Sequence, residues 1–529
     1  MISLKPKLKT ISTQWIFRIC YLYLFTPLVV FCFGFLKVYI SIPIVGIIVF
    51  CIWKIWQRQE PSFDLQHSKK DWGWFIVISF LWVLLSGIGG LTFQNYDFAG
   101  RNAIFRDLIE YSWPVYYPQL GSESYPDHVF ALDYYFGYWL LPALFGKFFG
   151  WTAANIALFL YSLLGVGLTT CLISMRIKVG LAKSILLLVF FSGMDVIGAF
   201  IFADQFPGFY PSLWPPITHL EWWRPFQFSS FTTQLFWVFN QSVPVWICTG
   251  MILNQKNLRS VFLIWSLCFF FAPIPSLGLA VLVAAKVLNR VWMIDSEAIK
   301  EHFSTRLRST FAELLSYENI IAGLLCFGLF ILFYKDNLAV SSTVFIPLSA
   351  DVIIQFTLFS LLEWLPFWAA SIRYRKADLA WYLIAPALAI SLFITMGGYF
   401  IISHRATIPI LFLLMLWVGE TIFHEKTRTS IMLLLVLLLG AFTPLYEVNR
   451  SVYRTIDYYV NHRGSATVED ACSLPQEERK AIPPQPEKDH PNSLVADDWC
   501  SIASFDQVRV TDYLADTSSS FFFNYLARK

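Results

Sequence analysis

The chain has 529 residues, a formal net charge of +3, and 57% hydrophobic, 18% aromatic and 14% charged residues. Soluble proteins carry about 25% charged residues, so this composition excludes a string of soluble domains. The small positive charge is spread over short loops and does not predict a nucleic-acid partner.

Long apolar blocks follow one another along the chain. A helix needs ~20 apolar residues to cross a membrane, because each residue rises 1.5 Å through ~30 Å of hydrocarbon. Trp and Tyr near the block ends are typical of membrane interfaces. The sequence therefore predicts an all-α, polytopic transmembrane helical bundle of about 13 spans in membrane lipid. The clearest blocks are residues 16–40, 74–93, 185–202, 344–362, 379–400 and 431–442.

Basic residues orient the chain, because Lys and Arg concentrate on the cytoplasmic side of a cell membrane. Lys5, Lys7 and Lys9 predict a cytoplasmic N-terminus. No small-residue cleavage site follows the first apolar block, which we interpret as a retained span. The basic-poor loops 94–130 and 204–231 are expected on the outer face, together with everything after about residue 446.

Residues 132–149 do not fit a simple crossing. If they crossed, the basic loop 176–183 would lie outside. Pro142 and Gly146 also interrupt the segment, so we interpret it as interfacial or re-entrant. The expected organisation is an N-terminal hairpin of two spans, a transmembrane core and a small polar extracytoplasmic segment, in residues 1–70, 71–445 and 446–529.

The first outer loop carries the densest group of ionisable residues. Asp97 follows the 74–93 block directly, where a carboxylate can take a proton from an incoming hydroxyl. From Arg101 onward the spacing is helical, and Asn102, Arg106 and Ile109 share one face. This pattern predicts a short helix on the membrane surface. The structural alternative is that Asp97 only caps that helix.

His404 and Arg405 lie in a predicted tight outer turn between two apolar blocks. Arginine offers a fixed fork of donors that matches phosphate oxygens, so Arg405 is a candidate phosphate ligand. The alternative is that its side chain reaches toward lipid head groups for solvation alone.

The second outer loop is rich in aromatic residues and prolines and contains His219, Glu221 and Arg224. Such a surface binds a sugar or a peptide by stacking, or it forms a membrane-facing aromatic belt. Asp195 lies within the preceding apolar block, roughly 12 Å from its outer end at 1.5 Å per residue. A carboxylate at that depth is paired, protonated or facing water, which makes it a candidate site residue or a structural hydrogen-bond acceptor.

Cys472 and Cys500 are the two cysteines in the polar C-terminal segment. A disulfide between them is plausible in an exported segment, and two unpaired thiols are the alternative. The sequence contains no Gly-rich phosphate loop, His-Glu-x-x-His, Cys-x-x-Cys or Gly-x-Ser-x-Gly motif. A nucleotide-driven motor, a zinc protease and a serine hydrolase are therefore not expected.

The sequence combines Asn95-Tyr96-Asp97 after a span, surface-helix residues 101–113, the aromatic stretch 134–139 with Tyr135, Ser-Gly-Met-Asp at 192–195, and Arg-Ala-Thr-Ile-Pro-Ile-Leu at 405–411. In these features it resembles a bacterial group within the GT-C superfamily of integral-membrane glycosyltransferases. It departs from better-known members, because it lacks Lys-Pro-Pro-Leu and has a single Asp where many members carry an acidic pair.

The resemblance implies transfer of a sugar from a polyprenyl-phosphate carrier to an envelope acceptor on the outer face. It makes Asp97 the general base on the acceptor hydroxyl. No cofactor is expected, and a divalent metal ion remains an open alternative that no motif in the sequence indicates. The residues expected at the donor phosphate are Arg405, His404, Arg101 and Arg106, and those expected at the substrate are Asp195, His219, Glu221, Arg224 and Tyr135.

Other function classes remain open. A secondary transporter or lipid flippase usually has repeated halves and helices broken in mid-membrane, and the Pro273–Pro275 turn is the only such break that the sequence indicates. A polymerase or ligase of lipid-linked glycans would use His219 or Arg224 more than Asp97. A scaffold or sensor without a reaction would tolerate loss of both Asp97 and Arg405.

Overall fold

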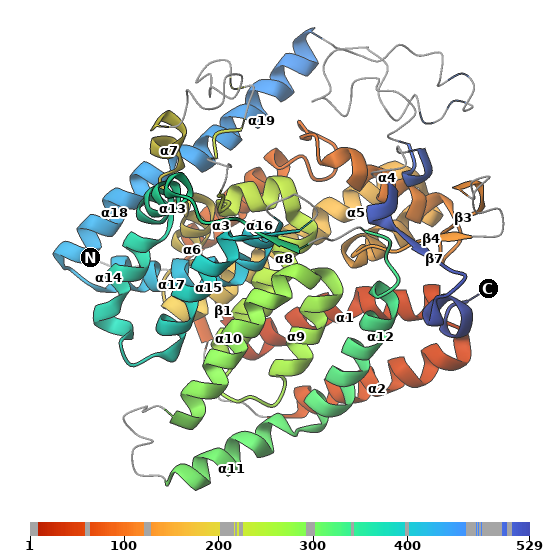
Figure 1. The fold of residues 1–529 in the computed structure, drawn as a ribbon, viewed down its shortest axis with the longest axis horizontal. Coiled ribbons are helices and arrows are strands. Elements are labelled where there is room, and N and C mark those ends of the chain that lie inside the picture. Colours follow the sequence, from red (N-terminus) through yellow and green to blue (C-terminus); the bar gives the residue numbers. More distant parts are fainter. Residues whose placement is uncertain are drawn as a thin grey trace, which may run out of the picture.

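The computed structural model describes residues 9–58, 64–120, 129–201, 216, 219–221, 226–292, 302–339, 343–396, 401–461, 472, 474, 478, 500–504 and 510–528. These residues are mostly helical, as the apolar blocks predict (Figure 1). The first half contains α1 (Thr13–Phe35), α2 (Val38–Gln57), α3 (Lys69–Leu85), α4 (Phe98–Glu110), α5 (Gly137–Ile177), α6 (Leu181–Phe190), α7 (Asp195–Ile201), α8 (Phe231–Asn254), α9 (Val261–Phe271) and α10 (Pro273–Trp292). The second half contains α11 (Phe303–Leu314), α12 (Leu324–Tyr334), α13 (Ala350–Glu363), α14 (Leu365–Arg375), α15 (Leu379–Leu392), α16 (Ile401–Ala406), α17 (Ile408–His424), α18 (Arg428–Gly440) and α19 (Phe442–Asn461).

Several of these helices are long and apolar enough to cross a membrane. Within the described residues there are seven such helices, or up to nine if each of two bent helix pairs counts as one span. This number is smaller than the 13 or so spans that the sequence predicts. The difference arises because several apolar blocks are divided into shorter elements.

The block at residues 74–93 is one example. Its helix, α3, ends at Leu85, and Gly87, Gly89 and Gly90 follow with φ angles of 84°, 90° and 74°. Positive φ suits glycine because it has no Cβ, and it cannot continue a right-handed helix. Asp97 is therefore separated from the helix by an irregular turn and does not follow a span directly.

The blocks at 344–362 and 379–400 are also divided. Each contains a short strand, and β5 (Thr343–Phe345) pairs antiparallel with β6 (Ile394–Met396). The helix α13 then bends by 59° into α14 at Trp364. The predicted tight turn at 403–405 is part of the short helix α16.

The segment at residues 132–149 is continuous with the helix that follows it. Its helical part begins α5, which consists of two helical segments that meet at Gly150, where φ is 80°. The predicted interruption therefore lies at Gly150 and not at Pro142, which remains inside the first helical segment.

The N-terminal hairpin of α1 and α2 is part of the bundle and not a peripheral addition. The Tyr161 hydroxyl of α5 donates to the Tyr23 carbonyl of α1 at 3.0 Å, and the two rings stack at 4.1 Å. At the start of α1, β1 (Lys9–Ser12) pairs antiparallel with β2 (Asp64–His67). The segments that precede α1 and α3 therefore lie at the same end of the bundle.

A three-stranded antiparallel sheet joins the first outer loop to the C-terminal segment. Its order is β3 (Tyr116–Tyr117), β4 (Phe130–Leu132), β7 (Leu514–Asp516). Figure 1 shows β7 beside β4 and β3 at the edge of the molecule, near the C-terminus. Ala527 also bridges Leu36, between α1 and α2. The described end of the chain is thus built into the core.

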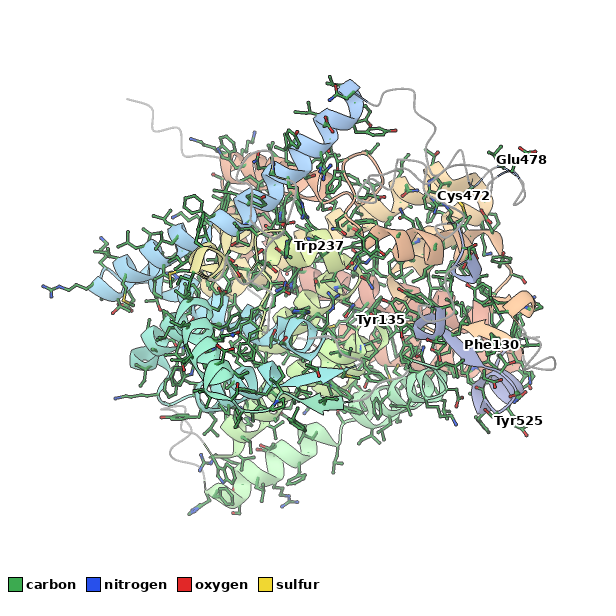
Figure 2. The ribbon with its side chains drawn as sticks, turned by 45° about the horizontal axis from the view of Figure 1, so that its top comes forward. Phe130, Tyr135, Trp237, Cys472, Glu478 and Tyr525 are labelled. Carbon is green, nitrogen blue, oxygen red and sulfur yellow. A yellow bond between two sulfur atoms is a disulfide. The ribbon has the colours of Figure 1, made fainter. Side chains whose placement is uncertain are left out.

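The expected boundary at residues 445–446 falls inside α19, so the structure places no element boundary there. Cys472 and Cys500 form a disulfide in the structure, with Cα atoms 5.4 Å apart. Figure 2 labels Cys472, and close to Cys500 the Ile502 backbone N–H donates to the Asp107 carboxylate of α4 at 2.9 Å.

Candidate active site

The turn before α4 fixes the position of Asp97. The buried Asn95 donates from its amide to the Phe236 carbonyl of α8 at 2.8 Å, and its side-chain oxygen accepts the Asp97 backbone N–H at 3.1 Å. The Asp97 carboxylate forms no capping bond to α4. Instead it accepts from Arg101 at 3.0 Å, and its side chain is 37% exposed. The capping alternative therefore does not describe this carboxylate, which is reachable by a ligand.

Arg405 approaches this pair from a distant part of the sequence. It lies on α16, within electrostatic range of Asp97, Arg101 and Tyr135. Among the described residues, no hydrogen bond or ion pair engages the Arg405 side chain. The cluster of Asp97, Arg101, Tyr135, Arg405 and Tyr513, which we call the outer cluster, therefore contains one paired and one available guanidinium.

Aromatic rings complete the outer cluster. The Tyr134 ring lies 3.7 Å from that of Tyr135 and 5.0 Å from that of Tyr513, which comes from the C-terminal segment. Burial raises the pKa of Tyr513, and Tyr135 and Asp97 raise it further. Tyr513 is therefore a neutral phenol at physiological pH. Figure 2 labels Tyr135 toward the middle of this view, and Tyr134, Tyr135 and Tyr513 are all partly buried.

His404 lies between the outer cluster and a second polar group. Burial, together with the positive charges of Arg405 and His219, lowers its pKa to about 3. Its imidazole is therefore neutral, and His404 adds no positive charge at a phosphate site.

The second group, which we call the His219 network, joins the second outer loop to α19. His219 contacts Glu447 at 2.8 Å and Glu221 at 3.3 Å. Trp237 donates to Glu447 at 3.1 Å, and Arg450 donates to it at 2.7 Å. Burial alone would lower the pKa of His219, but the Glu447 and Glu221 carboxylates raise it to about 9. The imidazole is therefore cationic and lies between two carboxylates.

Asp195 lies where interrupted helices meet. One of its oxygens accepts from the hydroxyls of Ser192 at 3.1 Å and Thr443 at 3.0 Å. The buried Glu363 carboxyl, at the bend between α13 and α14, lies beside Asp195, and one oxygen of each carboxyl has no hydrogen-bond partner among the described residues. The backbone of Gly193 makes this approach possible, since a Cβ there would lie 1.8 Å from a Glu363 carboxylate oxygen.

The structure brings four predicted residues together in the outer cluster: Asp97, Arg101, Arg405 and Tyr135. His219 and Glu221 form a separate network, and Asp195 belongs to the carboxyl pair with Glu363. The Arg106 guanidinium lies 4.5 Å from the ring centroid of Trp151 on α5. Arg224 lies outside the described residues.

The sequence predictions missed several residues of these groups. Glu447 and Arg450 belong to α19, which we interpreted as the start of a polar tail. Their i,i+3 spacing with Arg454 one turn later was an available signal of a helix with one polar, buried face. Glu363 and Tyr513 gave no comparable signal, because only tertiary packing places them beside Asp195 and Tyr135.

No protein-family model, curated protein or solved structure matches the chain.

Proposed function

We propose that the protein is an integral-membrane glycosyltransferase of the GT-C type. It transfers a sugar from a polyprenyl-phosphate carrier to an envelope acceptor on the extracytoplasmic face of the cell membrane. The proposed topology has about 13 crossings, a cytoplasmic N-terminus and an extracytoplasmic C-terminus, with the shorter apolar helices completing the crossings.

The observation that supports this proposal is the meeting of Asp97 and Arg405. A partly exposed carboxylate and an available guanidinium are brought within electrostatic range by elements far apart in the sequence. The adjacent tyrosine rings are suited to stacking against a sugar. A base, a phosphate ligand and a sugar-binding surface are the parts that this reaction requires.

In the proposed reaction, Asp97 takes the proton of the acceptor hydroxyl, whose oxygen attacks the anomeric carbon of the donor sugar. The bond from that carbon to the phosphate oxygen breaks, and the polyprenyl phosphate leaves with the electron pair. Arg405 stabilises the negative charge that develops on the phosphate. Direct attack inverts the configuration at the anomeric carbon.

Arg101 has a positioning role in this scheme. Its bond to the Asp97 carboxylate at 3.0 Å restrains the rotamer of that side chain. The second Asp97 oxygen remains available for the acceptor, because the Arg101 bond uses one oxygen.

The test is sugar transfer by the detergent-purified protein from a panel of radiolabelled polyprenyl-phosphate sugars. Loss of a general base costs about 10²- to 10⁴-fold in rate, so Asp97→Asn should reduce transfer by that factor. Arg405→Ala should reduce transfer by a similar factor, and Arg405→Lys should recover only part of it because lysine lacks the planar fork.

Glu110→Gln is the matched control for Asp97→Asn, because Glu110 is an exposed acidic residue at the end of the same helix. It should transfer sugar at the wild-type rate. Full activity of Asp97→Asn would refute the base assignment. Failure of the wild type to bind or use any of the donors would refute the whole proposal.

One observation favours a secondary transporter or flippase as the second candidate. The breaks between α6 and α7, α13 and α14, and α18 and α19 meet at the Asp195–Glu363 pair, and Gly440 packs directly on the Ser192 carbonyl. Broken helices around a buried carboxyl pair are typical of ion-coupled transporters. Donor-independent lipid translocation in proteoliposomes, abolished by Glu363→Gln and retained in Asp97→Asn, would favour this candidate.

A further inference from the structure

A separate pocket lies at the outer edge of the bundle, beside the C-terminus. Its volume is about 460 Å³, and its lining includes Gly34, Ser112, Trp113, Tyr116, Lys147 and Arg528. Ligand sites have volumes of about 300–1,000 Å³, so the pocket is large enough for a small polar group. It shares no residue with the outer cluster or the His219 network.

Gly34 on α1 creates the space for the wall of this pocket. A Cβ at this position would lie 2.4 Å from a ring carbon of Trp113. The indole N–H of Trp113 donates to the Leu108 carbonyl at 2.8 Å, and the ring stacks on Phe35 at 5.7 Å. The aromatic wall is therefore held rigidly between α1 and the end of α4.

Two cations lie in the lining, and none of the lining residues that the structure describes is acidic. The Lys147 ammonium donates to the carbonyls of Ile109 and Tyr111 and lies 5.0 Å from the Trp113 ring centroid. An ammonium has three donors, so one remains for a ligand. In the described part of the chain, the Arg528 guanidinium has no hydrogen bond or ion pair. Among the described lining residues the positive charge is therefore uncompensated, which suits an anion.

Exposed apolar residues flank the lining residues in sequence. Tyr39 is 71% exposed, Phe148 and Phe149 are 74% and 70% exposed, and Tyr525 is 63% exposed. Figure 2 shows Tyr525 at the outer edge of the molecule. Apolar and aromatic side chains around a cationic pocket are typical of a protein surface at the lipid interface.

We propose that this pocket binds the phosphate head group of an anionic membrane lipid. Lys147 and Arg528 bind the phosphate oxygens, Ser112 offers a hydroxyl, and the acyl chains lie along the exposed aromatic residues. The site is independent of the proposed glycosyl transfer, because binding requires neither a sugar donor nor Asp97. A free phosphate compound has the same charged group, and the exposed apolar flank favours the lipid.

The experiment is native mass spectrometry of the detergent-purified chain, titrated separately with phosphatidylglycerol, phosphatidylcholine and water-soluble glycerol phosphate. We expect one phosphatidylglycerol to bind at least about tenfold more tightly than phosphatidylcholine or glycerol phosphate. Lys147→Ala and Arg528→Ala should each weaken that binding by about tenfold. Lys335→Ala is the matched control, because Lys335 is an exposed cation that does not line the pocket.

Lys147 also donates to two backbone carbonyls, so Lys147→Ala can fail to fold. Arg528→Ala then decides the result, because the Arg528 side chain makes no hydrogen bond or ion pair with the described residues. Equal binding of phosphatidylcholine and phosphatidylglycerol would overturn the proposal. Unchanged binding in Arg528→Ala would also overturn it. Binding of glycerol phosphate as tightly as the lipid would show a soluble phosphate site instead of a lipid site.

Discussion

Replacement of Gly278 by alanine should displace the helix that carries Arg405. Gly278 lies on α10, where a Cβ would lie 1.7 Å from the Ala406 carbonyl oxygen and 3.0 Å from the Pro409 ring. Cβ contacts under 3.0 Å essentially do not occur, so α16 must move by more than 1 Å. The atom in the way belongs to the backbone, and a side-chain rotation cannot relieve the clash.

Two consequences of Gly278→Ala can be measured. Overpacking of this kind costs about 1–3 kcal/mol, which should appear in thermal unfolding of the detergent-solubilised protein. A misplacement of about 1 Å costs roughly 10²-fold in rate, so sugar transfer should fall by about that factor if Arg405 binds the donor phosphate.

Gly328→Ala on α12 is the matched control, because a Cβ there has no neighbour within 4 Å. It should be as stable as the wild type or more stable by about 0.4–1 kcal/mol, since alanine reduces the entropy of the unfolded chain. Gly278→Ala with the stability of Gly328→Ala would refute the close packing of α10 on α16. Reduced stability with unchanged transfer would refute the role of Arg405 in catalysis.

Three further predictions concern the polar groups. The folded-state pKa of His219 is raised from 6.5 to about 9, so this residue stabilises the fold fully below about pH 6.5 and loses its contribution as pH rises through 9. Urea unfolding at several pH values should show this fall in the wild type and not in His219→Gln. Burial raises the pKa of Asp107 to about 7, even though the Tyr117 hydroxyl donates to its carboxylate at 2.6 Å. The contribution of Asp107 to the free energy of unfolding should therefore be greatest below about pH 3.8 and decline toward pH 7. In Asp107→Asn the decline in stability between these pH values should be absent. If Asp107→Asn has the same pH profile of stability as the wild type, the raised pKa of Asp107 is contradicted. Gly193→Ala should lower the thermal unfolding temperature, because the new Cβ would clash with the Glu363 carboxyl. Adding Glu363→Ala to this variant should recover part of the lost unfolding temperature. If the single and the double variant lose the same amount, the contact between Gly193 and Glu363 is contradicted.

The candidate site could be predicted only in parts. Asp97 and Arg405 were identified one at a time, because a polar residue between apolar blocks is visible in a linear sequence. Their proximity was not visible, since it depends on how α4, α8 and α16 pack. Arg106 stays a predicted phosphate ligand, because helical spacing identifies a shared face and does not say which neighbour that face meets.

Chain composition and apolar run length by themselves determined that this is a helical protein with helices able to cross a membrane. These properties are local, because a run of apolar residues satisfies its backbone within its own helix. Only the tertiary structure decided where blocks break, as at Gly87 and Trp364, and which breaks meet. It also decided that β7 of the C-terminal segment joins β4 and so brings Tyr513 to the outer cluster, because pairing between distant strands is set by the packing of the whole chain.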